Sequence, residues 1–372
     1  MIKISKFLLI ATLLFAAACS TEDGGDNGGD SNGGDNFDRG EMLANWADNI
    51  IVPSFVAFQE ETQKLEDITK AFAENPGAAE LNVLKTQYKV AYQEFQTVEM
   101  FQIGKAEELN YRSFLNTYPT KTENIESKIA SGSYNLELPS NFAEQGFPAL
   151  DYLLYSYGST EETLEVFAAN PEYINYIVAV TERINALTTE VTASWEGDYR
   201  DTFANNTSSS STGSVDRFTN DYVMYFEKIL RSGKIGYPAG AFTGSPSPTN
   251  VEALYAGDIS KNLYLQALDS FEDFYYGVKV NGGENGLSYY QYLKYMQDAT
   301  SSESITASIA DQFSAIRAQS SELDSNLKSQ VETDNSKMLA AFDELQKEVV
   351  LLKVDMMQAL SISVDYVDSD GD

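Results

Sequence analysis

The sequence contains no histidine and a single cysteine, Cys19, among its 372 residues. Without histidine, the chain cannot assemble a Ser-His-Asp or Cys-His catalytic centre from its own side chains. It also cannot form a histidine-ligated zinc site or the HExxH helix of a zinc peptidase. One cysteine excludes an intramolecular disulfide, so the fold must depend on a hydrophobic core. Any metal site would use oxygen ligands, which suit hard cations such as calcium, magnesium, manganese or ferric iron.

Basic residues are also scarce. The chain has 25 Lys and Arg against 56 Asp and Glu, which gives a formal net charge of −31. Nucleic acids and anionic lipid surfaces would repel so acidic a protein, so we expect neither as a partner. The charge suits a cationic ligand, or serves solubility alone.

The N-terminus has the pattern of an export signal. Two lysines precede an apolar run that ends at Ala18, directly before Cys19. Residues 1–18 are therefore predicted to be a signal peptide, whose apolar run is too short to span a bilayer. Cys19 stands where a bacterial lipoprotein is acylated, and the alternative is a plainly secreted protein. Residues 19–37 are rich in Gly and Asp, which predicts a flexible tether. We expect an exported protein anchored in the outer membrane, on its periplasmic or cell-surface face.

The body is predicted to be helical because apolar residues recur at intervals of three and four. The segments with this period are residues 41–73, 81–98, 173–195, 215–229 and 338–360. Asn170-Pro171 predicts the start of one helix, and Thr120 to Glu123 fits a capping box before another. No segment shows the alternating pattern of a strand.

Two segments should be irregular. Residues 205–214 read as a polar linker, and residues 232–250 are dense in Gly and Pro.

A weak repeat relates the two halves, since Gly146 and Gly286 precede similar Tyr-Leu patterns at the same offsets. The fold class predicted is all-α, with two related antiparallel helical bundles packed together, at residues 38–204 and 205–372. Their seam is the default place for a ligand.

Six segments, in order, resemble the imelysin family. They are Asn45 to Pro53, Val98 to Gly104, Leu115 to Thr120, Gly146 to Tyr155, Lys234 to Gly240 and Tyr366 to Asp372. The resemblance implies an all-α, exported and often lipid-anchored protein that is linked to iron uptake. The family was first described as peptidases, and it has a G-x-H-x-x-E motif proposed to hold a metal.

The resemblance also suggests candidate site residues. In the family motif Gly146 matches, whereas Pro148 replaces the histidine and Asp151 replaces the glutamate. Proline offers no ligand atom, but it is well suited to the first turn of a helix. Asp151 would then either complement the helix dipole from that first turn or contact a ligand.

Glu99 matches a family acid in a helix expected to end at Gly104. It lies either on a solvated helix face or, buried, beside Asp151 in one two-carboxylate site. The family-like loops contribute Tyr118, Lys234 and Tyr237, which either fix turn geometry or line the seam.

The sequence favours a non-catalytic, lipid-anchored binding protein associated with iron acquisition. Its partners would be iron or an iron chelate, and outer-membrane components of iron uptake. One alternative is a metallopeptidase-like enzyme with a carboxylate-only site, because paired acids can perform acid–base chemistry. The other is an interaction or scaffold protein of the outer membrane.

Overall fold

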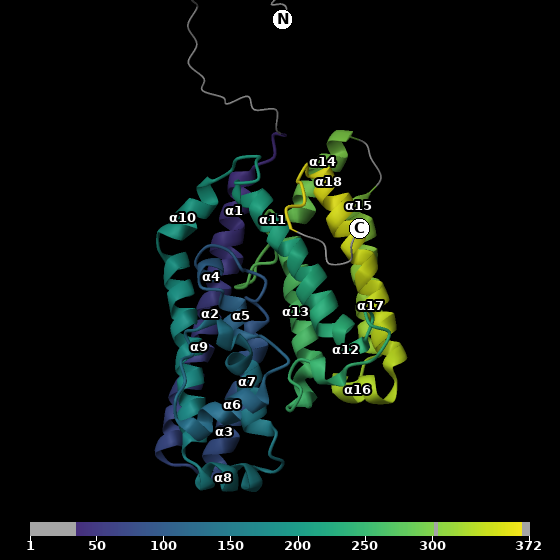
Figure 1. Ribbon diagram of the computed structural model, residues 1–372. Coiled ribbons are helices and arrows are strands. Elements are labelled where there is room, and N and C mark those ends of the chain that lie inside the picture. Colours follow the sequence, from purple (N-terminus) through teal and green to yellow (C-terminus); the bar gives the residue numbers. More distant parts are fainter. Residues whose placement is uncertain (1–34, 301–303, 367–372) are drawn as a thin grey trace, which may run out of the picture. The chain divides into compact units, whose positions relative to one another are not determined.

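The computed structural model describes residues 35–300 and 304–366 (Figure 1). The predicted signal peptide, Cys19 and nearly all of the predicted tether lie outside the described residues. Within the described ranges every regular element is helical and no strand occurs, which confirms the all-α prediction. None of the described helices is both long enough and apolar enough to cross a membrane.

The first half of the body begins with an almost continuous helix and ends with a pair of helices, α9 and α10. Its elements are α1 (Arg39–Asn45), η1 (Trp46–Ile51), α2 (Val52–Glu74), α3 (Ala78–Phe95), α4 (Lys105–Glu108), α5 (Tyr111–Leu115), α6 (Thr122–Ser131), η2 (Pro139–Glu144), α7 (Gly146–Tyr155), α8 (Thr160–Ala169), α9 (Glu172–Glu196) and α10 (Asp198–Asn205).

The second half is again helical, with long irregular connections. Its elements are α11 (Ser214–Met224), η3 (Tyr225–Gly236), α12 (Tyr237–Ala239), η4 (Pro248–Asn250), η5 (Gly257–Ile259), α13 (Ser260–Tyr276), α14 (Tyr289–Thr300), α15 (Ile305–Ser321), α16 (Leu327–Thr333), α17 (Asn335–Val350), η6 (Leu351–Met356) and α18 (Met357–Ala359).

The long helices follow the predicted periodicity. In α9 the residues Ile177, Val180, Ile184 and Leu187 form the buried face. The predicted start of α9 is nearly right, because the Asn170 side chain accepts a hydrogen bond from the backbone N–H of Glu172.

The predicted capping box before α6 is wrong. Lys121 is the N-cap residue and makes no side-chain cap bond. The Thr120 hydroxyl instead donates to the backbone carbonyl of Ala143, which ties this turn to the chain just before α7.

Two π-helical segments explain how helices continue up to a proline. η1 precedes Pro53 at the start of α2, and η3 precedes Pro238 in α12. Proline lacks an N–H and its ring clashes with the carbonyl four residues earlier in an α-helix, so a wider turn relieves the conflict. The prediction that residues 232–250 are all irregular is therefore wrong for its first part, which is helical as far as Ala239.

The helices pack in two groups that share aromatic contacts. Helix α2 packs along α3 and α9, and α17 packs along α15 and η3 (Figure 1). Between the groups, the Trp46 ring lies 5.5 Å from Phe218 and 5.0 Å from Phe274, and Phe101 contacts the same two rings. All four rings are almost completely buried. Burial of large aromatic side chains contributes much of a core's stability, so this junction is a substantial part of the fold.

The described residues from Phe37 onward form one compact unit by their backbone contacts. The boundary between bundles at residues 204 and 205, and the internal duplication, remain predictions from the sequence.

Candidate functional site

A buried network of charged side chains joins the two helix groups. Glu99 lies in the turns that follow α3, rather than in a helix as expected, and it is 2 % exposed. Lys234 is on the π-helical segment η3 and is 1 % exposed. Its Nζ lies 3.1 Å from Glu99 Oε2 and 2.7 Å from Oε2 of Glu252, which precedes η5. The structure thus brings together Glu99 and Lys234, two of the residues that the sequence suggested.

Amide and hydroxyl groups complete this network. Lys234 Nζ donates to Gln96 Oε1 at 2.6 Å, so its three N–H groups face three oxygen acceptors. The Asn116 amide donates to both Glu99 Oε1 and Glu252 Oε1 at 2.7 Å. Hydroxyl groups of two buried tyrosines also donate into the network, one to Asn116 and one to Glu99. Buried polar groups that are satisfied to this extent fix one arrangement of the surrounding elements.

The charges of the network stabilise one another. Burial alone favours the neutral form of Glu99, but Lys234, Arg112 and the Asn116 amide outweigh it and hold the pKa of Glu99 below its ordinary value. Burial likewise favours neutral Lys234, but Glu252 and Glu99 hold its pKa above the ordinary value. The ammonium group therefore stands where a cation bound between the two carboxylates would stand.

Asp151 binds the segment that connects η4 to η5, which also carries Glu252. Its carboxylate accepts hydrogen bonds from the backbone N–H groups of Tyr255 at 2.9 Å and Ala256 at 2.8 Å. Burial raises the pKa of Asp151 to about 7, although these two hydrogen bonds oppose the shift. Asp151 is not in the first turn of α7, so the helix-dipole interpretation is wrong. Asp151 and Glu99 are linked through the segment that carries Glu252, Tyr255 and Ala256.

The other motif positions serve the start of α7. Gly146 has φ +72°, and a Cβ there would lie 2.2 Å from the carbonyl oxygen of Leu115. Only glycine fits so close an approach of two backbones. Pro148 lies in the first turn of α7, where an N–H has no helical partner and proline is tolerated.

A cleft of about 210 Å³ opens beside Asp151. Two of the candidates from the sequence, Tyr118 and Pro148, line this cleft together with Asp151. The remaining lining residues are Pro119, Thr120, Thr122, Thr249, Val251, Ala253, Leu254 and Tyr255. The walls are mostly hydroxyl-bearing and apolar, and Asp151 is the acid among them.

Tyr237 does not belong to this site. It is 48 % exposed and lines a separate surface cleft with Phe242. Neither Tyr237 nor Lys234 lies in a loop, because helical structure continues through both positions.

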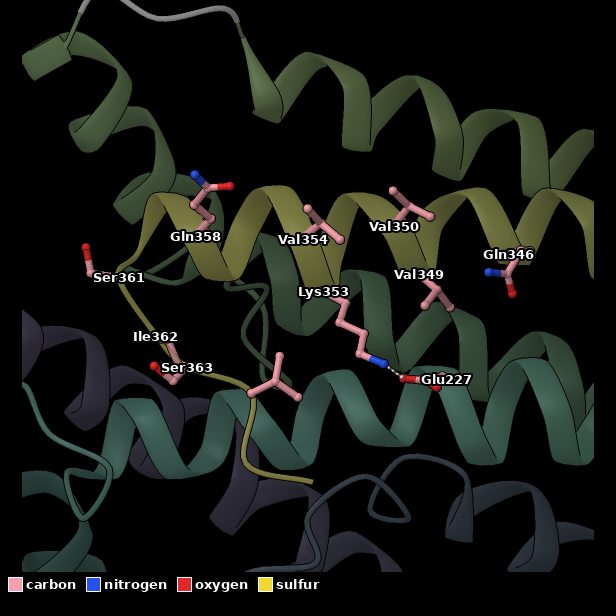
Figure 2. Close-up of a pocket in the computed structure, with 11 residues that line it drawn as sticks. Glu227, Gln346, Val349, Val350, Lys353, Val354, Gln358, Ser361, Ile362 and Ser363 are labelled. Carbon is pink, nitrogen blue, oxygen red and sulfur yellow. Dashed lines mark ion pairs between the residues drawn. The ribbon is translucent and has the colours of Figure 1, made fainter. Parts of the chain in front are cut away.

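A larger cleft lies elsewhere and was not predicted. It has a volume of about 680 Å³, and its walls come from η3, α17, η6 and the segment after α18 (Figure 2). Glu227 is 1 % exposed at this cleft and pairs with Lys353 at 3.1 Å, with Lys228 and with the Tyr366 hydroxyl. Figure 2 shows Lys353 reaching from its helix to Glu227. The family-like terminal segment that begins at Tyr366 was the one sequence signal for this region.

The carboxylates do not gather into a metal centre. Among the described residues, no group of three Asp, Glu or Cys side chains could hold a metal ion. At the seam the place between Glu99 and Glu252 is taken by Lys234, and the Asp151 oxygens already accept backbone hydrogen bonds. The arrangement does not fit the metal proposed for the family motif.

The fold and the seam therefore define an all-helical protein in which an altered motif stands beside a buried acid–lysine network. The sequence profile of imelysin matches residues 51–352, and the chain belongs to the imelysin family. Iron-regulated protein A of Synechococcus elongatus is 24 % identical over 124 residues, which span 33 % of each chain. The match thus covers a third of that relative's length.

Two solved structures share the fold. One is a candidate iron-regulated protein A precursor from Parabacteroides distasonis, with a TM-score of 0.73 and 16 % identity, covering 89 % of this chain and 97 % of that one. The other is an imelysin-like protein from Psychrobacter arcticum, with a TM-score of 0.65 and 16 % identity, covering 88 % and 97 %.

Proposed function

We propose that this chain is a non-catalytic, iron-binding protein of the cell envelope that takes part in iron acquisition. Its anchor would be a lipid on Cys19, and its partners would be outer-membrane components of iron uptake. The observation that carries the non-catalytic assignment is the position of Lys234, whose ammonium forms ion pairs with both Glu99 and Glu252 at the seam. The iron assignment is supported by the relatives described as iron-regulated protein A.

The same observation weighs against the peptidase alternative. A metallopeptidase needs an ion with an open coordination position, which activates water or polarises the substrate carbonyl. Here the ammonium of Lys234 and the amide of Asn116 already fill the space between the carboxylates. A carboxylate pair acting without metal would need one acid and one base within reach of a substrate, but Glu99 is fully buried and ion-paired.

The cleft beside Asp151 is the ligand site that we propose. Its volume suits a small chelate rather than a length of peptide chain. Its hydroxyl groups can replace water around a polar ligand, and no lysine or arginine lines it. We therefore expect a neutral or cationic iron complex rather than an anionic one.

Equilibrium dialysis with the neutral ferric nitrilotriacetate complex tests this proposal. Thr249→Trp places an indole at the exposed rim of the cleft, and Thr243→Trp makes the same change on an exposed residue outside it. We expect binding to fall at least tenfold in Thr249→Trp and to be unchanged in Thr243→Trp. Equal binding by both variants would remove the cleft from the proposal. Failure of the wild-type protein to take up iron in any form would overturn the function itself.

A peptidase assay on an unfolded protein substrate separates the alternative. The proposal predicts no cleavage above background. Cleavage that a chelator abolishes and that Glu99→Gln removes would establish the enzyme instead.

A further inference from the structure

Three tyrosine hydroxyl groups converge on one carboxylate beside the cleft. Glu126 of α6 accepts hydrogen bonds from Tyr152 at 2.6 Å and Tyr157 at 3.0 Å on one oxygen, and from Tyr173 on the other. The rings pack together, with centroids 5.7 Å apart for Tyr152 and Tyr157 and 5.9 Å apart for Tyr157 and Tyr173. Five oxygen atoms from four side chains, two carboxylate and three phenolic, therefore occupy one small volume.

Four separate parts of the chain supply this cluster. Glu126 lies on α6, Tyr152 on α7, Tyr157 in the turn before α8, and Tyr173 on α9. Helices α6, α7 and α9 contact one another (Figure 1), which holds Glu126, Tyr152 and Tyr173 in place, and Tyr157 joins them from the turn before α8. Sites built on rigid elements are the ones that can preorganise a ligand set.

The cluster has an acid but no ion pair to balance it. Within the described ranges, Glu126 makes no salt bridge to a lysine or arginine, and Lys128, the nearest lysine on α6, pairs with Glu144. All four side chains of the cluster are partly exposed. An ion could therefore reach them from solvent without opening the core.

We propose that Glu126, Tyr152, Tyr157 and Tyr173 form a ferric-iron site. Neighbouring oxygen ligands of a small octahedral ion at about 2.0 Å lie roughly 2.8 Å apart, close to the separations of 2.6 and 3.0 Å between Glu126 Oε1 and the hydroxyl oxygens of Tyr152 and Tyr157. Carboxylate and phenolate oxygens are hard ligands, which a small, highly charged ion prefers. One carboxylate and three phenolates would supply four negative charges against the +3 charge of the ion.

Iron binding at this site must release protons. Each phenol that becomes a ligand gives its proton to solvent, so uptake requires deprotonation and weakens as the pH falls. Burial and the neighbouring Glu126 raise the pKa of Tyr173 to about 12, and burial with the neighbouring groups raises the pKa of Tyr152 and Tyr157 as well. The phenols are therefore protonated without metal, and the ion has to displace the protons.

The inference rests on the proposed function for the identity of the ion, and it gives that ion a place. Tyr255 lines the cleft, and its ring lies 5.4 Å from that of Tyr152. Asp151 and Tyr152 are consecutive residues of α7, one at the cleft and one in the cluster. Iron that enters the cleft as a chelate would be separated from the phenols of the cluster by the ring of Tyr255.

Ferric nitrilotriacetate titration, followed by visible absorption, tests the site. Phenolate bound to ferric iron gives a charge-transfer band in the visible range, which carboxylate ligands alone do not give. We expect this band in the wild-type protein at one iron per chain, with proton release on binding. Each of Tyr152→Phe, Tyr157→Phe and Tyr173→Phe should weaken iron binding at least tenfold, and the triple variant should lose the band.

Tyr155→Phe is the matched control. Tyr155 is on the same helix, but its hydroxyl donates to the backbone carbonyl of Lys85 instead of Glu126, so the band should be unchanged. Circular dichroism verifies that each variant is folded. Glu126→Gln removes the negative charge of the cluster, and its amide oxygen still accepts hydrogen bonds from the phenols.

The outcomes separate this inference from the proposed function. Iron bound without the band, or a band that survives in the triple variant, would overturn the tyrosine site. If that iron still depended on the cleft, as judged by Thr249→Trp, the proposed function would stand. No iron bound in any form would overturn both.

Discussion

Replacing the buried lysine of the seam gives the sharpest test of how the two helix groups are held together. In Lys234→Met the ammonium disappears, and Glu99 and Glu252 are left facing each other through the Asn116 amide, which donates a hydrogen bond to each of them at 2.7 Å. Removing one partner of a buried ion pair typically costs about 3–5 kcal/mol, because the remaining charge stays desolvated. We expect a loss of that size in the free energy of unfolding at pH 8, measured by urea denaturation.

The pH dependence of this loss has a definite sign. In the wild-type protein the pKa of Glu99 is lowered, so its stabilising contribution is present above the ordinary carboxyl range and is lost as the pH falls. Without Lys234, burial would raise the pKa of Glu99, so the variant loses stability as the pH rises. The difference between wild type and Lys234→Met should therefore be larger at pH 8 than at pH 5.

Two further variants control the interpretation. Lys347→Met removes a lysine that is 59 % exposed and pairs with Glu344 on one helix, and it should change stability little. Adding Glu252→Gln to Lys234→Met removes one of the repelling charges and should recover part of the loss. A loss below about 1 kcal/mol in Lys234→Met, or one independent of pH, would refute the account of the seam.

Three other changes test separate parts of the structure. Burial raises the pKa of Asp151 to about 7, so its ionisation lowers the free energy of unfolding as the pH rises toward 7. Asp151→Asn removes this ionisation, and urea denaturation should therefore show a smaller fall in stability between pH 5 and pH 8 than in the wild-type protein. Gly146→Ala should destabilise the protein by more than about 1 kcal/mol, because its Cβ would meet the Leu115 carbonyl at positive φ, and a shift in thermal midpoint measures this. Glu348 is buried, and neither of its carboxylate oxygens has a hydrogen-bond partner among the described residues. Burial raises its pKa well above the ordinary value, so Glu348→Met should stabilise the protein at pH 8 by about 1 kcal/mol or more, with a smaller gain at pH 5.

The sequence was sufficient for the fold class because helical periodicity is local. The long apolar stripe of residues 173–195 marks α9 almost to its ends. The prediction of an irregular segment was wrong for residues 232–239. Gly and Pro usually end an α-helix, but here a π-helical segment continues the helix up to Pro238. The prediction of a capping box at Thr120 was wrong because the Thr120 hydroxyl donates its hydrogen bond to the backbone carbonyl of Ala143, which is distant in sequence.

The candidate site was predictable only in part. Motif comparison pointed to Glu99, Asp151 and Lys234, and all three are buried around one connecting segment. Glu252 carried no local signal, because it lies in an irregular connection and its role depends on tertiary contacts, with Lys234 18 positions away and with Asn116 136 positions away. The tyrosines around Glu126 were hidden for the same reason, since helical spacing alone marks tyrosine as a core residue.

Counting bound metal per chain is the most direct test of the central claim, that this protein binds iron without using a metallopeptidase centre. The purified protein would be equilibrated in parallel with ferric nitrilotriacetate, zinc, calcium and manganese, desalted, and analysed by mass spectrometry. The account predicts about one ferric ion per chain, retained in Glu99→Gln, and no stoichiometric zinc. Stoichiometric zinc that Glu99→Gln or Asp151→Asn abolishes, or no iron at all, would contradict it.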